Sequence, residues 1–120
     1  MRREAAAFLW DVESAASAVE QFTRGKTLED FLGDPMVQAA VERKFEIIGE
    51  ALSQLAKMRP DLSARIPDLR EIIGFRNVLI HRYAAVDHRL VWRTIQTRVQ
   101  PLRAIVDSLL REVGGSPSPS

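Results

Sequence analysis

Apolar residues recur every three or four positions along most of the chain, and this spacing predicts a succession of amphipathic helices. The first predicted helix runs from Ala5 to about Phe22, because its apolar side chains fall on one face and charged residues separate them. That face consists of Phe8, Leu9, Val12, Ala15, Ala16 and Val19. Gly25 interrupts the pattern, so we expect the helix to end before it.

A short second helix is predicted by its capping residues. Thr27 can cap a helix that continues through Phe31, with Glu29 and Asp30 in the first turn. Gly33 follows at the position where a helix ends. The segment is too short to be a main element of the fold.

A long third helix is predicted to begin at Asp34 and Pro35 and to end near Lys57, because aspartate caps well and proline suits the first helical position. Its apolar stripe is Val37, Val41, Phe45, Ile48, Leu52 and Leu55, and a polar row follows at Gln38, Glu42, Glu46, Glu50 and Gln54. Gly49 lies inside this helix at a cost of roughly 1 kcal/mol relative to alanine. We therefore expect another backbone to pack closely there.

Pro60 ends the long helix, and we expect a loop from there to Pro67, which occupies a first-turn position of a fourth helix. That helix is apolar around much of its circumference, with Leu69, Ile72, Ile73, Phe75, Val78, Leu79 and Ile80. Such a helix belongs either in the middle of a bundle or in a subunit interface.

Asp87 is predicted to cap a last helix that runs to about Val113 and is kinked by Pro101. Its stripe is Leu90, Val91, Ile95, Val99, Leu102, Ile105, Val106 and Leu109. Residues 114–120 form a Gly/Ser/Pro tail that we expect to be disordered. The expected fold is all-α, an antiparallel bundle of four main helices and one short helix in a single domain over residues 1–113.

Composition narrows the function only slightly. The 120 residues are 46% hydrophobic and 28% charged with a formal net charge of +1, which excludes a disordered acidic chain and a globally basic nucleic-acid protein. The chain has no cysteine, and Asp11 and Glu13 interrupt its first apolar stretch. We therefore expect a cytoplasmic protein without disulfides, signal peptide or membrane span.

A metal site is not predicted. The two histidines, His81 and His88, are seven residues apart with a turn between them. This separation is not a recognised spacing for metal ligands. No cofactor is predicted either.

Candidate chemistry is concentrated at the end of the fourth helix, where Arg76, Asn77, His81 and Tyr83 lie within eight residues. One interpretation is structural: Arg76 and His81 satisfy backbone carbonyls or pair with glutamates of the long helix. The other is catalytic. Histidine can exchange a proton with a ribose 2′-hydroxyl or a leaving oxygen, and arginine can stabilise charge on a phosphate. This pair suffices for RNA cleavage without a metal.

Helical geometry restricts how Arg76 and His81 can cooperate. Residues five apart are rotated by roughly 140° around a helix axis, so the two side chains cannot share one face of a straight helix. Either the helix ends or bends before His81, or the site is assembled from two protomers across a two-fold axis.

The C-terminal half is basic despite the near-neutral total. The segment from Arg70 to Arg103 contains seven arginines and only two acidic residues, Glu71 and Asp87. This excess suits a phosphate backbone, with Arg82, Arg89 and Arg93 as possible contacts, although a solvated helix face explains any single arginine equally well.

The sequence resembles the HepT-like toxins of the HEPN superfamily, whose motif R-x4-H-x-Y is met by Arg76, His81 and Tyr83. Residues 40–51 are similar to a second block of that family, and residues 66–74 to the approach to the motif. Arg82 departs from the small residue that the family commonly has between histidine and tyrosine.

This resemblance implies a homodimeric, metal-independent endoribonuclease with Arg76 and His81 as catalytic residues. It also implies a type VII toxin–antitoxin pair, in which a minimal nucleotidyltransferase antitoxin transfers AMP onto Tyr83. We expect Asn77 and either Glu50 or Glu46 to support the site, since Gly49 lets a carboxylate of the long helix reach Arg76. The alternatives are a catalytically silent module that binds a nucleotidyltransferase or a nucleotide, and a purely structural dimerisation bundle.

Overall fold

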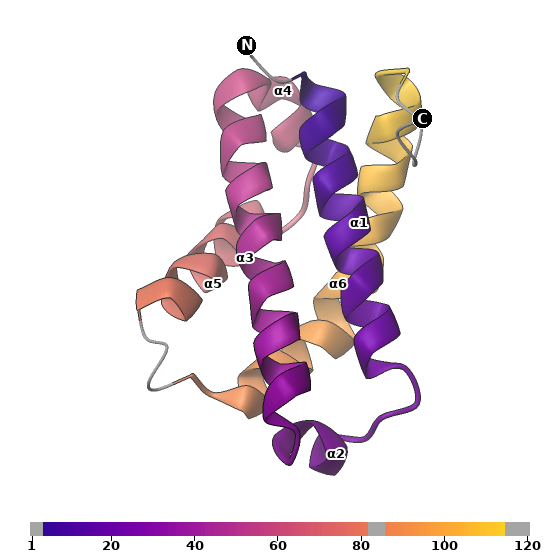
Figure 1. Ribbon diagram of the computed structural model, residues 1–120. Helices are drawn as coiled ribbons and strands as arrows, with labels where there is room; N and C mark the ends of the chain where they lie inside the picture. Colours follow the sequence, from indigo (N-terminus) through magenta and orange to yellow (C-terminus); the bar gives the residue numbers. More distant parts are fainter. Residues whose placement is uncertain (1–3, 82–85, 115–120) are drawn as a thin grey trace.

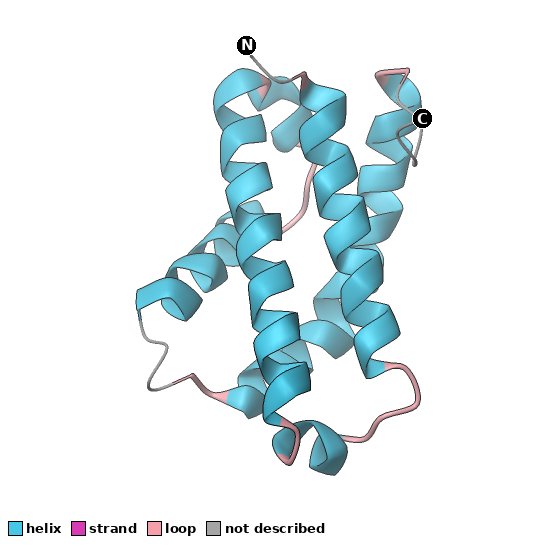
Figure 2. Cartoon of the chain, viewed as in Figure 1, coloured by secondary structure: helices cyan, strands magenta, loops and turns pink. Residues whose placement is uncertain are grey.

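The computed structural model describes residues 4–81 and 86–114 and consists of helices joined by short loops (Figures 1 and 2). Four helices are long: α1 (Ala5–Thr23), α3 (Pro35–Met58), α5 (Leu69–His81) and α6 (His88–Glu112). Two are short, α2 (Leu28–Leu32) and α4 (Pro60–Ser63). The all-α prediction is confirmed, with one more short helix than expected.

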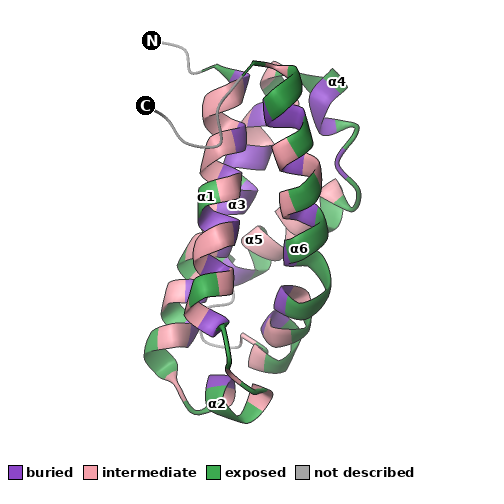
Figure 3. Cartoon of the chain, turned by 90° about the vertical axis from the view of Figure 1, so that its right-hand side faces the viewer, coloured by how far each residue is buried: buried purple, intermediate pink, exposed green. Residues whose placement is uncertain are grey.

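Helices α1, α3 and α6 form the body of the bundle, and α1 runs antiparallel to the other two (Figure 1). Their inward faces bury most of the predicted stripes, and Figure 3 shows these buried positions between the helices. Phe8, Val37 and Ile105 are half-buried, and Leu90 is exposed. Fully buried members include Leu9, Val12, Val41, Ile48, Leu52, Val91, Val106 and Leu109. Phe31 of α2 closes one end of the core.

The predicted caps are present at three helix starts. Thr27 and Asp30 exchange hydrogen bonds in a capping box at α2. The side chain of Asp34 accepts from the backbone N–H of Val37 at α3, and Asp87 accepts from those of Arg89 and Leu90 at α6. These are contacts between near neighbours in the chain, which explains why the sequence alone located the boundaries.

The connection between α3 and α5 differs from the prediction of a loop. Pro60 occupies the first turn of α4, so this proline begins a helix as well as ending one. Asp68 then has a φ of 60°, in the left-handed region, and no α-helix can continue through it. Helix α5 consequently begins at Leu69, and Pro67 lies outside it.

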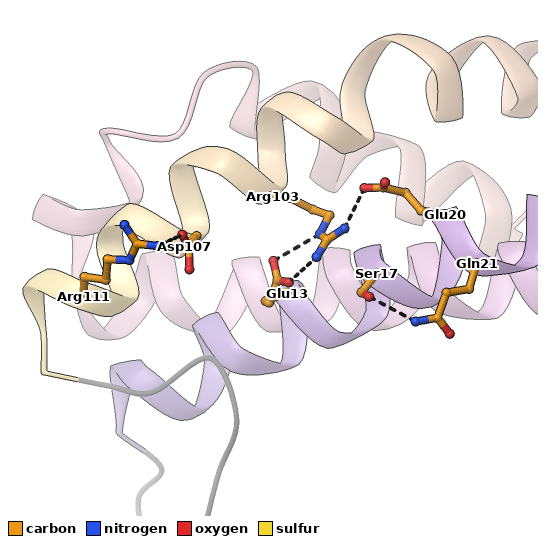
Figure 4. Close-up of polar contacts among 7 residues, drawn as sticks. All are labelled: Glu13, Ser17, Glu20, Gln21, Arg103, Asp107 and Arg111. Carbon is orange, nitrogen blue, oxygen red and sulfur yellow. Dashed lines mark hydrogen bonds and ion pairs between the residues drawn. The ribbon is translucent and has the colours of Figure 1, made fainter. Parts of the chain in front are cut away.

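A charged cluster fastens α1 to α6. The guanidinium of Arg103 bonds to Glu13 at 2.7 Å and to Glu20 at 3.0 Å, and Figure 4 shows it between the two carboxylates. Hydrogen bonds to these carboxylates raise the pKa of Arg103.

Pro101 lies inside α6, and Figure 1 shows that this helix changes direction along its length, as a proline predicts.

Helix α5 lies at the side of the bundle, not in its middle. It packs mainly against α3, and only Leu79 among its residues is buried. Val78 and Ile80 are exposed, and Ile72, Ile73 and Phe75 are half-buried.

Within the described part of the chain, no helix combines the length and the hydrophobicity needed to cross a bilayer.

Candidate active site

Arg76 lies where α5 crosses α3, directly over Gly49. A Cβ atom on Gly49 would lie 2.6 Å from the Cγ of Arg76, which is closer than side-chain atoms approach. The glycine therefore allows the two helices to meet at this point. The close approach of a second backbone at Gly49, expected from the sequence, is the approach of α5 to α3.

The guanidinium of Arg76 is held by two neighbours. One nitrogen donates to Glu50 of α3 at 2.7 Å, and another donates to the side-chain oxygen of Asn77 at 2.9 Å. Glu50 in turn accepts from Gln54 at 3.2 Å. The Arg76 side chain is 27% exposed, so the group is fixed in orientation and still reaches solvent.

Of the two candidate carboxylates, Glu50 contacts Arg76 and Glu46 does not. Glu46 instead faces Arg43 across 3.5 Å, one turn earlier on α3. Both belong to a hollow of about 340 Å³ that also has Arg76 on its wall. Its apolar walls come from Phe8 of α1, Ile47 of α3 and Ile80 of α5.

His81 is the last residue of α5, and it is exposed. The helix continues through His81, so the alternative in which it ends before this residue is wrong. Arg76 and His81 therefore lie roughly 140° apart around the axis and about 7.5 Å apart along it. The two side chains therefore leave α5 on different faces.

The remaining motif residues, Arg82 and Tyr83, lie outside the described residues. Arg89 and Arg93 follow on α6, four residues apart and both exposed. Neither has a carboxylate partner among the described residues, which leaves their charges available to an anion.

The sequence predicted a polar row on α3 but assigned no contact to most of its side chains. The structure gives each of them a contact. Gln38 is buried and donates to the backbone oxygens of Phe31 and Leu32, so it joins α2 to α3. Glu42 lies 3.8 Å from Nδ1 of His88, beside the ring of Phe31.

Burial raises the pKa of Glu42 above its ordinary value, and the charge of His88 opposes that rise. Nδ1 of His88 is buried and has no hydrogen-bond partner among the described residues. No cluster of three His, Cys, Asp or Glu side chains suited to a metal occurs in that part of the chain. His88 therefore contributes to packing at the start of α6.

Sequence reasoning missed Arg43 and the hollow beside Arg76. The signal was present in part, because Arg43, Glu46, Ile47 and Glu50 recur at helical spacing on α3. The walls from α1 and α5 were not visible in the sequence, since they depend on how the helices pack.

Comparison with known proteins identifies the family. Residues 12–109 match the family model described as ribonuclease HepT-like. A probable ribonuclease HepT of Thermococcus cleftensis is 38% identical over 109 residues, covering 91% of this chain and 98% of that protein. A putative RNase of Methanocaldococcus jannaschii is 32% identical over 108 residues, covering 88% and 96%.

A putative RNase of Caldanaerobacter subterraneus is 37% identical over 89 residues, covering 74% of this chain and 79% of that protein. No solved structure matches the chain. The matched region runs from α1 to α6 and contains Arg76, His81 and Tyr83 together with Gly49 and Glu50. The chain belongs to the HepT-like ribonuclease family.

Proposed function

We propose that this protein is a metal-independent endoribonuclease that acts as a homodimer, with each site built from Arg76 of one protomer and His81 of the other. The single observation that carries the proposal is the continuation of α5 through His81. It places the two side chains on different faces of the helix in one chain, and a two-fold axis perpendicular to α5, passing between the two positions, can bring Arg76 of one protomer to His81 of the other. Family membership supports RNA as the substrate.

The exposed side of α5 supports the dimer. Val78 is 42% exposed, and among the described helices none packs on the side of α5 that carries it to the extent that α3 packs on the other. Burying Val78 against its copy removes apolar area from water. The motif then lies at the interface.

The proposed chemistry is transfer within the RNA. The 2′-oxygen attacks the adjacent phosphorus while the P–O5′ bond breaks, giving a 2′,3′-cyclic phosphate and a 5′-hydroxyl. His81 accepts the 2′-hydroxyl proton, and the imidazolium can protonate the leaving 5′-oxygen. Arg76 stabilises the charge that develops on the phosphate, and Glu50 and Asn77 hold its guanidinium in place.

RNA beyond the reacting phosphate is proposed to follow the start of α6. Arg89 and Arg93 lie on this helix with their charges available, and Arg82 precedes it in the sequence. Cations of this kind hold phosphates without reading the base sequence.

We further propose that the protein is the toxin of a toxin–antitoxin pair in the cytoplasm, inhibited when a minimal nucleotidyltransferase adds AMP to Tyr83. Tyr83 is two residues from His81 in the sequence. A phosphate and a nucleoside at that position add negative charge and bulk where the RNA phosphate binds. Repulsion and steric exclusion then prevent cleavage.

Mixing two inactive variants tests the composite site. His81→Ala and Arg76→Ala are purified separately, and each should cleave total RNA about 10²-fold to 10⁴-fold more slowly than the parent. When equal amounts exchange subunits, half of the dimers are mixed and one of their two sites is intact, so about a quarter of the parental activity returns. EDTA should leave the parental rate unchanged.

Three results would contradict this proposal. Without recovery on mixing, each site belongs to one chain. Loss of activity in EDTA would mean that a metal is required. If His81→Ala cleaves at the parental rate, the activity comes from a contaminating nuclease, and the silent module that binds a nucleotidyltransferase or nucleotide becomes the better interpretation.

A further inference from the structure

The hollow beside Arg76 has one apolar and one polar part. Phe8, Ile47 and Ile80 line it from three different helices, so its apolar walls exist only in the folded chain. Its volume of about 340 Å³ falls in the range of roughly 300–1,000 Å³ typical of small-molecule sites. An occupant with flat apolar faces suits these walls.

The polar part is the pair formed by Arg43 and Glu46. Their closest nitrogen and oxygen atoms are 3.5 Å apart, at the limit of a hydrogen bond, and the side chains are 69% and 29% exposed. Such a weak exposed pair contributes little to stability and can exchange partners readily. The pair therefore offers an arginine donor and a carboxylate acceptor side by side at the edge of the hollow.

Charge argues against a phosphate inside this hollow. On its walls the carboxylates of Glu46 and Glu50 already match the charges of Arg43 and Arg76, so the described pairs leave no surplus positive charge inside the hollow. Arg76 is already bonded to Glu50. A neutral group that carries its own donors fits better than an anion, and in RNA that group is a nucleobase.

We propose that the hollow binds a guanine base next to the cleaved phosphate, with Glu46 and Arg43 determining the preference. Glu46 accepts from N1–H and the 2-amino group of guanine, and Arg43 donates to O6. The base lies against Phe8, Ile47 and Ile80. A base held there places its own phosphate beside Arg76, which borders the same hollow.

This inference rests on the proposed ribonuclease function and names the base that this site selects. Guanine alone among the four bases presents two adjacent donors to one carboxylate and an acceptor beside them. Inosine has the same N1–H and O6 and lacks the 2-amino group. It therefore isolates the contribution of one hydrogen bond to Glu46.

The test uses short RNA oligonucleotides that contain a single guanosine or, at the same position, a single inosine. We expect the parental protein to cleave the guanosine RNA with a kcat/KM roughly 5-fold to 150-fold above that for the inosine RNA. Glu46→Gln should bring this ratio close to one. Arg43→Met should lower cleavage of both RNAs and preserve the ratio, because both bases retain O6.

Glu29→Gln, an exposed change of the same kind on α2, is the matched control and should behave as the parent does. Circular dichroism of each variant establishes that it is folded. The subsite is refuted if the parent cleaves both RNAs equally or if Glu46→Gln keeps the preference.

Binding of the same RNAs, measured by fluorescence anisotropy, separates the two proposals. If the parent binds guanosine RNA more tightly than inosine RNA and cleaves neither, the ribonuclease proposal fails and the guanine subsite stands. If it cleaves both without preference, the ribonuclease proposal stands and the subsite fails. If it neither binds nor cleaves them, both fail.

Discussion

Gly49 and Arg76 occupy the same point on facing sides of the α3–α5 contact. Any Cβ atom on Gly49 would overlap the first carbons of the Arg76 side chain. The absence of that atom lets Arg76 extend across α3 to Glu50, 2.7 Å away. This glycine thus permits both the close packing of α5 on α3 and the contact that orients the candidate catalytic arginine.

Gly49→Ala should therefore destabilise the fold and lower activity together. The added methyl group forces α5 away from α3, and overpacking of this kind costs about 1–3 kcal/mol. Urea unfolding followed by circular dichroism measures this loss. Gly74→Ala is the control, because a Cβ there meets nothing within 4 Å. That change should stabilise the chain by about 0.5–1 kcal/mol, since alanine favours helix. Equal effects at both positions would contradict the close approach.

Arg76→Ala should weaken RNA binding in a salt-dependent way, in addition to its loss of cleavage. An arginine that holds a phosphate releases counterions on binding, so the difference in affinity between parent and variant should shrink as salt rises. Anisotropy titrations at several salt concentrations measure it. Arg70→Ala removes an exposed arginine from the same helix and controls for overall charge. If both variants lose affinity equally, Arg76 makes no specific phosphate contact.

Val78→Asp should convert a dimer into a monomer. Val78 is 42% exposed on the open side of α5, and a carboxylate facing its own copy across a two-fold axis is desolvated and repelled. Light scattering should give about 27 kDa for the parent, twice the chain mass of 13.5 kDa, and the monomer mass for the variant. Met36→Asp, at an 84% exposed position on α3, should remain dimeric. A parent of monomer mass at micromolar concentrations would refute the composite site.

Tyr83→Phe should cleave RNA almost normally and escape the proposed antitoxin. The substitution keeps the ring and removes only the hydroxyl that accepts AMP. Incubating each protein with the nucleotidyltransferase and ATP, then weighing it by mass spectrometry, should reveal one added AMP on the parent and none on the variant. Addition of AMP to Tyr83→Phe would place the modification on another residue.

Glu42→Gln should change how stability depends on pH. Burial raises the pKa of Glu42 in the folded chain, against the opposing charge of His88. The folded state therefore binds this proton more tightly than the unfolded state. The resulting stabilisation is complete below the unfolded pKa and is lost as pH rises through the folded pKa. Glutamine cannot ionise, so the free energy of unfolding of the variant, relative to that of the parent, should rise as the pH increases from the unfolded value of roughly 4 through the raised pKa of the folded chain. Parallel urea-unfolding curves across this range would contradict the shift.

Local chemistry in the sequence determined most of the helices. Caps at Thr27, Asp34 and Asp87 act between residues close in the chain, so the starts of three helices followed from residue type. The contact of Glu50 with Arg76 was also predictable, because Gly49 marked the place where a second backbone comes close. The short α4 was missed, since a proline that ends one helix can equally begin the next.

Only the tertiary structure decided where α5 lies and what surrounds its arginine. The apolar residues of this helix indicate that its surface is buried. Their spacing does not show whether the same chain or a second copy of it covers that surface. Packing of α5 on α3 left Val78 and Ile80 exposed. The same packing brought Phe8 and Ile80 to the hollow beside Arg43 and Glu46. These residues are far apart in the sequence, and only the way the helices pack brings them together.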